Sequence, residues 1–326
     1  MESATGVPLA DGISPATPAA DMADRVVAAL ATVMHAPAGT LRLPLLCLLA
    51  EGHVLVEDVP GVGKTVLAKA LARTLDLRFS RLQFTPDLLP SDVTGVNVYD
   101  QQEGAFRFRP GPVFANVLLV DEINRASPKT QSALLEAMQE TQVTVDGETY
   151  PLERPFLAIA TQNPLEYEGT YPLPEAQLDR FAVRMSIGYP PLSEEARMLT
   201  EQTGEPPLDQ LVPVAARADL VAAISAARDI FVEESVTRYV VALLRHTRAN
   251  GHLALGASPR SGIALLRLAK ARALVERREY VTPDDIREMA EPVLSHRLLL
   301  APQARSAGLG PADVVRAALD GTPVPV

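Results

Sequence analysis

The segment Pro60-Gly-Val-Gly-Lys-Thr65 has the residue types and spacing of a loop that binds nucleotide phosphates. Its glycines let backbone N–H groups approach phosphate oxygens, and a helix beginning after the loop adds the positive end of its dipole. Lys64 can reach the β- and γ-phosphates, and the Thr65 hydroxyl can bind Mg²⁺. The general pattern has a glycine where this chain has Asp58. We therefore predict nucleotide contacts from Pro60, Gly61, Val62, Gly63, Lys64, Thr65 and Val66.

Two adjacent carboxylates follow an apolar segment further along the chain, Val117-Leu-Leu-Val-Asp121-Glu122. At the end of a buried strand, Asp121 would lie beside the phosphate loop and hold Mg²⁺ through water. Glu122 would act as the general base that polarises the attacking water. A solvated acidic turn is the plainer interpretation of such a pair alone. The combination of this carboxylate pair with the phosphate loop predicts nucleotide hydrolysis. The chain lacks the Asn-Lys-x-Asp motif that reads guanine, and this absence favours ATP over GTP.

Short apolar segments that alternate with helical patterns predict the elements that position these residues. The expected strands are His53–Glu57, Arg78–Phe84, Val117–Val120 and Phe156–Thr161. Such alternation indicates an α/β fold with a parallel sheet covered on both faces. Beyond the proline pairs at 190–191 and 206–207 the pattern becomes helical, over Ala215–Arg228, Ser235–Ala249, Ser261–Glu279 and Pro283–Ala290.

The predicted organisation is a flexible tail over residues 1–20, an α/β core over 21–190 that begins with a helix at Asp21–Ala31, and a small helical domain over 191–326. Two hairpins are predicted within the core. Gln142–Tyr150 alternates apolar and polar residues around Asp146-Gly147, and Val96–Phe108 alternates around a turn at Asp100–Gly104. Surface hairpins with one buried face are the plainer interpretation of both.

Composition excludes several classes of protein. No apolar stretch approaches the roughly 18 residues of a membrane helix, and no secretory signal is visible, so no membrane insertion is expected. The single cysteine, Cys47, fits a reducing cytoplasm. A net charge of −10 argues against non-specific binding to nucleic acid. Arginine supplies 26 of the 30 basic residues, so an isolated arginine carries little functional signal.

Two segments resemble the MoxR family of AAA+ ATPases, in its helix-2-insert branch. They are Asp121-Glu-Ile-Asn-Arg-Ala-Ser-Pro-Lys-Thr-Gln131 and Ala160–Phe181, which reads Ala-Thr-Gln-Asn-Pro-Leu-Glu-Tyr-Glu-Gly-Thr-Tyr-Pro-Leu-Pro-Glu-Ala-Gln-Leu-Asp-Arg-Phe. The loop Glu57–Thr65 is similar to the family's own variant of the phosphate loop. The resemblance extends from about His53 to Ala304. It implies a P-loop AAA+ core followed by a helical lid domain.

The resemblance also assigns roles to three further residues. Asn163 matches sensor 1, which helps to orient water near the γ-phosphate, although an Asn before a Pro is usually a cap. Arg180 matches the arginine finger, which acts on ATP bound by the neighbouring subunit, although a surface ion pair is the plainer interpretation. Arg260 matches sensor 2 at the start of a lid helix, where Ser258 and Pro259 are suited to the cap and first position.

The two hairpins match the helix-2 insert and the pre-sensor-1 hairpin, which are expected to face a central pore. One segment departs from the family. Near the adenine the family usually has a Val-Gly-Gln-like turn, whereas this chain reads Val33-Met-His-Ala-Pro-Ala-Gly39. Here a surface position for His35 is favoured over contact with the base.

The resemblance implies a Mg²⁺-dependent ATPase that forms a homo-oligomer, a hexameric ring, and acts as a chaperone on protein clients, with von Willebrand A-domain proteins as partners. Two alternatives remain open. A nucleic-acid translocase shares this architecture and would use Arg107 and Arg109, but Gln142–Tyr150 is acidic and has no basic residue. A catalytically silent scaffold is disfavoured because the hydrolytic residues are all present.

Overall fold

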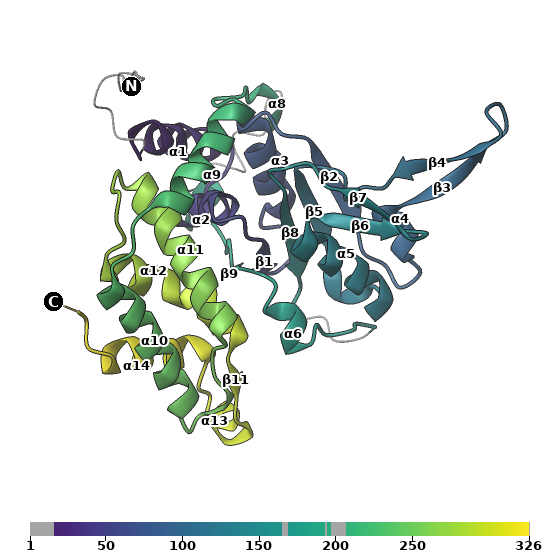
Figure 1. Cartoon of the computed structure of the whole chain (residues 1–326). Helices are drawn as coiled ribbons and strands as arrows, with labels where there is room; N and C mark the ends of the chain where they lie inside the picture. The colour runs from purple at the N-terminus through teal and green to yellow at the C-terminus, as the bar shows by residue number, and fades with distance from the viewer. Residues whose placement is uncertain (1–15, 165–168, 193, 197–206, 326) are drawn as a thin grey trace, which may run out of the picture.

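The computed structural model describes residues 16–164, 169–192, 194–196 and 207–325. Its centre is a sheet of five parallel strands (Figure 1). The strands are β1 (Val54–Glu57), β2 (Phe79–Gln83), β5 (Val117–Asp121), β8 (Leu157–Gln162) and β9 (Val183–Met185), in the order β2-β5-β8-β1-β9. The predicted α/β fold with a parallel sheet is confirmed.

Successive residues of the sheet pack against helices on its two faces. Val54 and Val56 belong to one cluster of buried apolar side chains, whereas Leu55 belongs to another. The first cluster contains side chains of α3 (Lys64–Thr74), and the second contains side chains of α5 (Pro128–Glu140). Strands covered on both faces form continuous apolar runs in the sequence. The four predicted strands agree with the structure to within one residue at each end, although β2, at the edge of the sheet, is only partly buried and lacks such a run.

The fifth strand, β9, was not predicted. It has three residues, and Arg184 interrupts its apolar pattern. The guanidinium of Arg184 pairs with the carboxylate of Glu57 on the neighbouring strand β1 at 2.9 Å, which accommodates a charge at that position.

The carboxyl-terminal part is mainly helical, as predicted. Its helices are α8 (Pro207–Gln210), α9 (Arg217–Asp229), α10 (Glu234–Ala249), α11 (Pro259–Val275), α12 (Pro283–Leu294), α13 (Pro302–Ser306) and α14 (Pro311–Gly321), with the 3₁₀ turn η2 (Ser295–Arg297). A small antiparallel ribbon, β10 (Leu253–Leu255) with β11 (Leu299–Leu300), was not predicted. Ser258 caps α11 by accepting a hydrogen bond from the N–H of Ser261, and Pro259 is its first residue, as expected.

Two helices at the amino-terminal end differ from prediction. Helix α1 spans Ala16–Ala31, so residues 16–20, which the sequence placed in a flexible tail, are helical; residues 1–15 lie outside the described residues. They are helical because Ala16, Ala19 and Ala20 are buried in the apolar core. Helix α2 (Ala38–Leu49) was not predicted, and it contains Pro44, a residue that disfavours helix interiors. Both helices pack against α9 and α11 of the helical domain.

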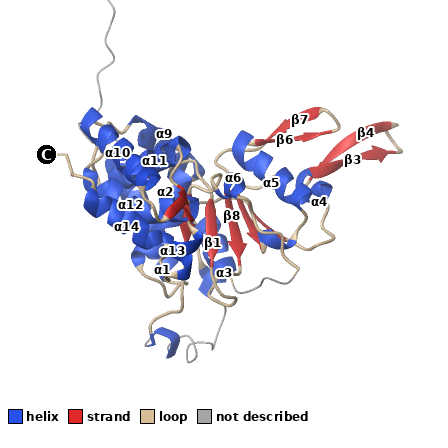
Figure 2. Cartoon of the chain, turned by 90° about the horizontal axis from the view of Figure 1, so that it is seen from below, coloured by secondary structure: helices blue, strands red, loops and turns tan. Residues whose placement is uncertain are grey.

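Both predicted hairpins are present, and Figure 2 shows them projecting together from the side of the sheet away from the helical domain. They are β3 (Gly95–Asp100) with β4 (Ala105–Pro110), and β6 (Gln142–Val145) with β7 (Glu148–Pro151). The rings of Phe108 and Tyr150 stack between the hairpins at 3.9 Å, and Asn97 donates to Asp146 at 2.8 Å. The hairpins therefore contact each other as well as the sheet.

Helix α5 connects the hairpins to the segment that carries the adjacent carboxylates. The 3₁₀ turn η1 (Ile123–Arg125) separates Glu122 from α5, and α5 ends directly before β6. At its first turn, the Thr130 hydroxyl donates to the carbonyl oxygen of Leu88, just before α4 (Pro90–Thr94) and β3. Helix α5 thus contacts the base of one hairpin and leads into the other. Within the described ranges, no helix has the length and apolarity needed to span a membrane.

Candidate functional site

The predicted phosphate loop joins the carboxyl end of β1 to the amino end of α3. Gly61 and Gly63 have φ angles of +89° and +91°, in the left-handed region that glycine adopts at little cost. Gly63 immediately precedes α3, so the unpaired N–H groups of the first helical turn face the loop. The Nζ of Lys64 donates to the carbonyl oxygen of Asp58 at 2.5 Å. Burial lowers the pKa of Lys64, and three neighbouring carboxylates oppose that shift.

Asp58, which departs from the general pattern of the loop, is 7% exposed and forms several hydrogen bonds. Its Oδ2 accepts from the backbone N–H of Ile187 at 2.6 Å, the N–H of Gly188 at 2.9 Å and the hydroxyl of Ser186 at 3.1 Å. The carboxylate therefore holds the start of the phosphate loop to the segment that leaves β9.

Asp121 and Glu122 lie at the carboxyl end of β5, and a side chain of β2 donates to each. Nε of Arg81 lies 2.6 Å from Oδ2 of Asp121, and Nε2 of Gln83 lies 2.7 Å from Oε2 of Glu122. Strand β2 is next to β5 in the sheet, with Gln83 opposite Asp121. The backbone N–H of Glu122, whose φ of 57° is left-handed, donates to the buried hydroxyl of Thr161 at 3.0 Å.

One cavity of about 400 Å³ brings most of the predicted residues together. Its lining consists of Pro60, Gly61, Gly63, Lys64, Thr65, Val66, Arg81, Gln83, Asp121, Glu122, Thr161 and Asn163. Val62 is the exception among the predicted nucleotide contacts, because its side chain packs against the apolar core instead. The phosphate loop, the two carboxylates and Asn163 therefore face the same space.

The residues of this cavity fit a bound Mg²⁺. The Thr65 hydroxyl and the Asp121 carboxylate are hard oxygen donors, which Mg²⁺ prefers. No group of three metal-ligating side chains occurs among the described residues. A site with few protein ligands suits Mg²⁺, which usually retains water and binds substrate phosphates. Asp121 is 8% exposed and its Oδ2 is bonded to Arg81, so binding there changes that ion pair.

Arg180 and Arg260 lie together at the other edge of the sheet. Both line a cavity of about 200 Å³ that also contains His53, the residue before β1. Arg180 precedes β9, whereas the phosphate loop follows β1. Because these two strands are parallel, the arginines lie at the amino ends of the strands and the loop lies at the carboxyl ends. Neither arginine lines the phosphate-loop cavity. The surface ion pair considered for Arg180 is not formed with any described residue, and its Nε is buried without a hydrogen-bond partner.

The segment Val33–Gly39 does lie beside the phosphate loop, since a side chain added at Gly63 would meet the Met34 methyl carbon at 3.3 Å. His35 is only partly exposed. Its Nδ1 lies 2.7 Å from the carboxylate of Glu194, and both residues line a cavity of about 440 Å³. His35 is therefore a half-buried residue near the loop rather than a plain surface residue.

Three side chains that line the phosphate-loop cavity were not predicted from the sequence: Arg81, Gln83 and Thr161. Arg81 and Gln83 alternate along β2, so both reach the same edge, but only the strand order shows that β5 is their neighbour. Residues 165–168 of the family-like segment Ala160–Phe181 lie outside the described residues.

Comparison with known proteins agrees with this geometry. Residues 53–183 match the ATPase family associated with various cellular activities (AAA), and residues 245–318 match the AAA lid domain. The protein YeaC of Bacillus subtilis is 50% identical over 87% of this chain and 89% of its own length. Chaperone MoxR1 of Mycobacterium tuberculosis is 43% identical over 86% of this chain and 76% of its own length.

Among solved structures, one from Cytophaga hutchinsonii that is assigned as an ATPase is 37% identical, with a TM-score of 0.88 over 96% of this chain and 97% of its own. The site that contains Lys64, Asp121 and Glu122 therefore lies within a fold and a sequence that this chain shares with these proteins along most of its length. The chain belongs to the MoxR family of AAA+ ATPases and is an ATP-hydrolysing enzyme.

Proposed function

We propose that this enzyme is a Mg²⁺-dependent, hexameric chaperone of the cytoplasm that uses ATP to remodel protein clients. The ring is supported by the position of Arg180 and Arg260, which lie at the edge of the sheet opposite the phosphate loop. In a ring each subunit places one face against the opposite face of the next. The two arginines of one subunit then approach ATP bound by its neighbour. An arginine at the γ-phosphate stabilises the charge that develops there during hydrolysis.

Within one subunit, each residue of the cavity has a separate role. Lys64 and the loop N–H groups bind the phosphates, and Thr65 and Asp121 hold Mg²⁺, which neutralises phosphate charge when bound. Glu122 accepts a proton from the attacking water, which Asn163 helps to orient. The carboxylate of Glu122 exchanges its hydrogen bond with Gln83 for one with that water.

The proposal divides the chain into an ATPase core over residues 21–190 and a lid domain over residues 191–326. The cavity beside Met34 and His35 is the proposed place for adenine, because it adjoins Gly63 of the phosphate loop. The contact with Gly63 supports an adenine pocket here, although the segment Val33–Gly39 departs from the family's usual turn.

The hairpins are the proposed contact for a protein client, with von Willebrand A-domain proteins as the expected partners. Tyr99 and Phe106 are 52% and 71% exposed on the β3–β4 hairpin, so aromatic groups are available for apolar contact. Asp146 and Glu148 at the turn of the other hairpin repel a phosphate backbone. Arg107 is paired with Glu103, which reduces the positive charge of the first hairpin. Similarity to Chaperone MoxR1 of Mycobacterium tuberculosis supports a chaperone.

The test compares ATPase rates with single-stranded DNA, duplex DNA, RNA and a purified candidate von Willebrand A-domain protein, at physiological salt. We expect stimulation by the protein alone. Replacing Thr144–Glu148 with a short glycine turn should remove that stimulation. The basal ATPase rate should stay within a few-fold of the wild-type rate, because the phosphate loop follows β1 and is separate from this hairpin. Stimulation by a nucleic acid that is lost when Arg107 and Arg109 are neutralised would establish the translocase instead.

A further inference from the structure

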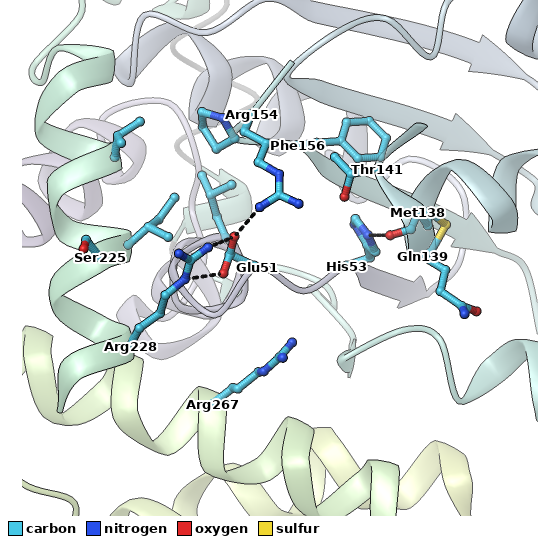
Figure 3. A pocket seen from close by; sticks show the side chains of 14 residues that line it. Glu51, His53, Met138, Gln139, Thr141, Arg154, Phe156, Ser225, Arg228 and Arg267 are labelled. Atoms are coloured by element: carbon cyan, nitrogen blue, oxygen red, sulfur yellow. Dashed lines mark hydrogen bonds and ion pairs between the residues drawn. The ribbon is translucent and has the colours of Figure 1, made fainter. Parts of the chain in front are cut away.

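The cleft between the α/β core and the helical domain holds more arginines than the proposed function uses. It consists of two adjoining cavities of about 660 and 200 Å³. Figure 3 shows the larger one, where Arg154 from above and Arg228 from the left both reach Glu51, and Arg267 of α11 points into it from below. Arg267 also lines the smaller cavity, beside Arg180 and Arg260. The two cavities therefore form one surface that passes over His53.

This surface is strongly positive, in contrast to the chain's net charge of −10. Six arginines line the two cavities, against the two acidic residues Glu51 and Asp179. Both acids are already paired. Glu51 accepts from Arg228 at 2.5 and 2.8 Å and lies 3.7 Å from Arg154, and Asp179 accepts from the buried Arg297 at 2.8 Å.

Three arginines on this surface are left without an acidic partner among the described residues: Arg180, Arg260 and Arg267. Arg260 and Arg267 lie seven residues apart on α11, which places them on one face about 10 Å apart. Ile263 and Ala264, which lie between them, line the same cavity. Two of the three unpaired charges thus lie on one face of α11, with Ile263 and Ala264 between them, rather than at a single point.

The geometry points to Arg267 as a third arginine that binds the nucleotide phosphates of the neighbouring subunit. This inference rests on the proposed ring. A planar guanidinium matches phosphate oxygens in pairs, and no acidic group in the cleft competes for Arg267. The chain's own nucleotide is out of reach, since β1 alone separates His53 from the phosphate loop by roughly 13 Å.

Two helical turns separate Arg267 from Arg260, so the two contact different parts of the nucleotide. Arg180 and Arg260 act at the reacting phosphate, and Arg267 binds the remainder of the phosphate chain. Such a contact stabilises bound ATP and the transition state equally, so its loss raises KM and leaves kcat nearly unchanged. Loss of one hydrogen-bonded charge pair corresponds to about a tenfold to hundredfold rise in KM.

The experiment uses full-length Arg267→Ala protein, with Arg245→Ala as the matched control. Arg245 is an exposed arginine on α10 that lines neither cavity and has no ion pair among the described residues. We expect Arg267→Ala to raise KM for ATP as above, and Arg245→Ala to leave it unchanged. In a Glu122→Gln background, ATP-dependent assembly followed by sedimentation velocity should need about tenfold more ATP when Arg267 is also replaced.

Mixing subunits separates a contact made across the interface from one made within a chain. Lys64→Ala subunits cannot bind ATP but still offer Arg267 to a neighbour, so they should restore part of the activity of Arg267→Ala subunits at low ATP. Equal mixing creates such an interface at about a quarter of positions. Arg180→Ala subunits, mixed in the same way, test the ring itself.

Each outcome decides a different claim. Rescue of both variants supports the inference. Rescue of Arg180→Ala without rescue of Arg267→Ala, or a KM for Arg267→Ala equal to that of Arg245→Ala, overturns the role of Arg267 and leaves the ring intact. Failure to rescue Arg180→Ala overturns the ring.

Discussion

Replacement of Asp58 tests whether the carboxylate that departs from the general phosphate-loop pattern is a structural requirement of this chain. Asp58→Gly would restore the glycine of the general pattern, yet we expect it to destabilise the protein. The carboxylate is 7% exposed and accepts three backbone N–H bonds, two of them from the distant residues Ile187 at 2.6 Å and Gly188 at 2.9 Å, and one from the adjacent Val59 at 3.1 Å. Each hydrogen bond to a buried charge contributes about 1.5–3 kcal/mol, so loss of the two bonds from Ile187 and Gly188 should lower the free energy of unfolding by roughly 3–6 kcal/mol.

The measurement is urea unfolding of Asp58→Gly and Asp58→Ala. The two variants should agree within about 1 kcal/mol, because the lost carboxylate dominates the effect and Asp58 does not have a left-handed backbone. Asp58→Asn keeps one acceptor oxygen and should lose about half as much. Hydrogen exchange gives a local check, since the amides of Ile187 and Gly188 should exchange faster in all three variants.

The control is Asp229→Ala, which removes an exposed aspartate from the last position of α9 and should leave stability unchanged. Wild-type stability in Asp58→Gly, with unchanged exchange at Ile187 and Gly188, would refute the structural role. The chain would then tolerate the general pattern, and the departure at position 58 would have no energetic basis in these hydrogen bonds.

Three further predictions concern catalysis, pH and the hairpins. Glu122→Gln should retain ATP affinity, measured by calorimetry, and lose nearly all turnover, measured by phosphate release, whereas Lys64→Ala should lose ATP binding. Full turnover by Glu122→Gln would show that Glu122 is not the general base. Burial lowers the pKa of His53 from 6.5 to about 4, so below pH 6.5 the unfolded chain binds more protons and stability falls with pH down to about 4. Between pH 7 and pH 5 the wild type should therefore lose about 2 kcal/mol more than His53→Gln in urea unfolding, because His296, whose pKa burial also lowers, contributes equally to both proteins; equal losses in the two would contradict this. Tyr150→Ala removes the ring stacked on Phe108, so hydrogen exchange in the β3–β4 hairpin should accelerate while the basal ATPase rate stays within a few-fold; unchanged exchange would show that the hairpins are independent.

The features that the sequence predicts well depend on neighbours along the chain. The phosphate loop needs only its glycines, its lysine and a strand before a helix, and Asp121 with Glu122 needs only the apolar strand before it. The hairpin at Asp146-Gly147 is similarly local. These elements agree with the structure because the residues that identify them are adjacent in the sequence, although contacts such as those of Asp58 with Ile187 and Gly188 then hold them in place.

The features that the sequence did not predict depend on contacts between distant segments. The hydrogen bonds of Arg81 and Gln83 to the two carboxylates exist because β2 lies beside β5, an order that no local pattern contains. The position of Arg260 follows from the packing of α11 against α1 and α2. Helix α2 was missed because Pro44 opposes a helix locally, whereas burial of its apolar side chains favours one.

The contacts at the two ends of helix α5 have a mechanical consequence for the two hairpins. One end of this helix is separated from Glu122 by five residues, three of which form the 3₁₀ turn η1, and it contacts the segment before β3 through Thr130 and Leu88. A single residue, Thr141, separates its other end from β6. Since α5 contacts the base of one hairpin and leads into the other, and the rings of Phe108 and Tyr150 stack between them, a displacement of α5 would be transmitted to both hairpins. Under the proposed function, a displacement that starts beside Glu122 would therefore reach both hairpins, and a client that contacts both would be bound and released by the two together.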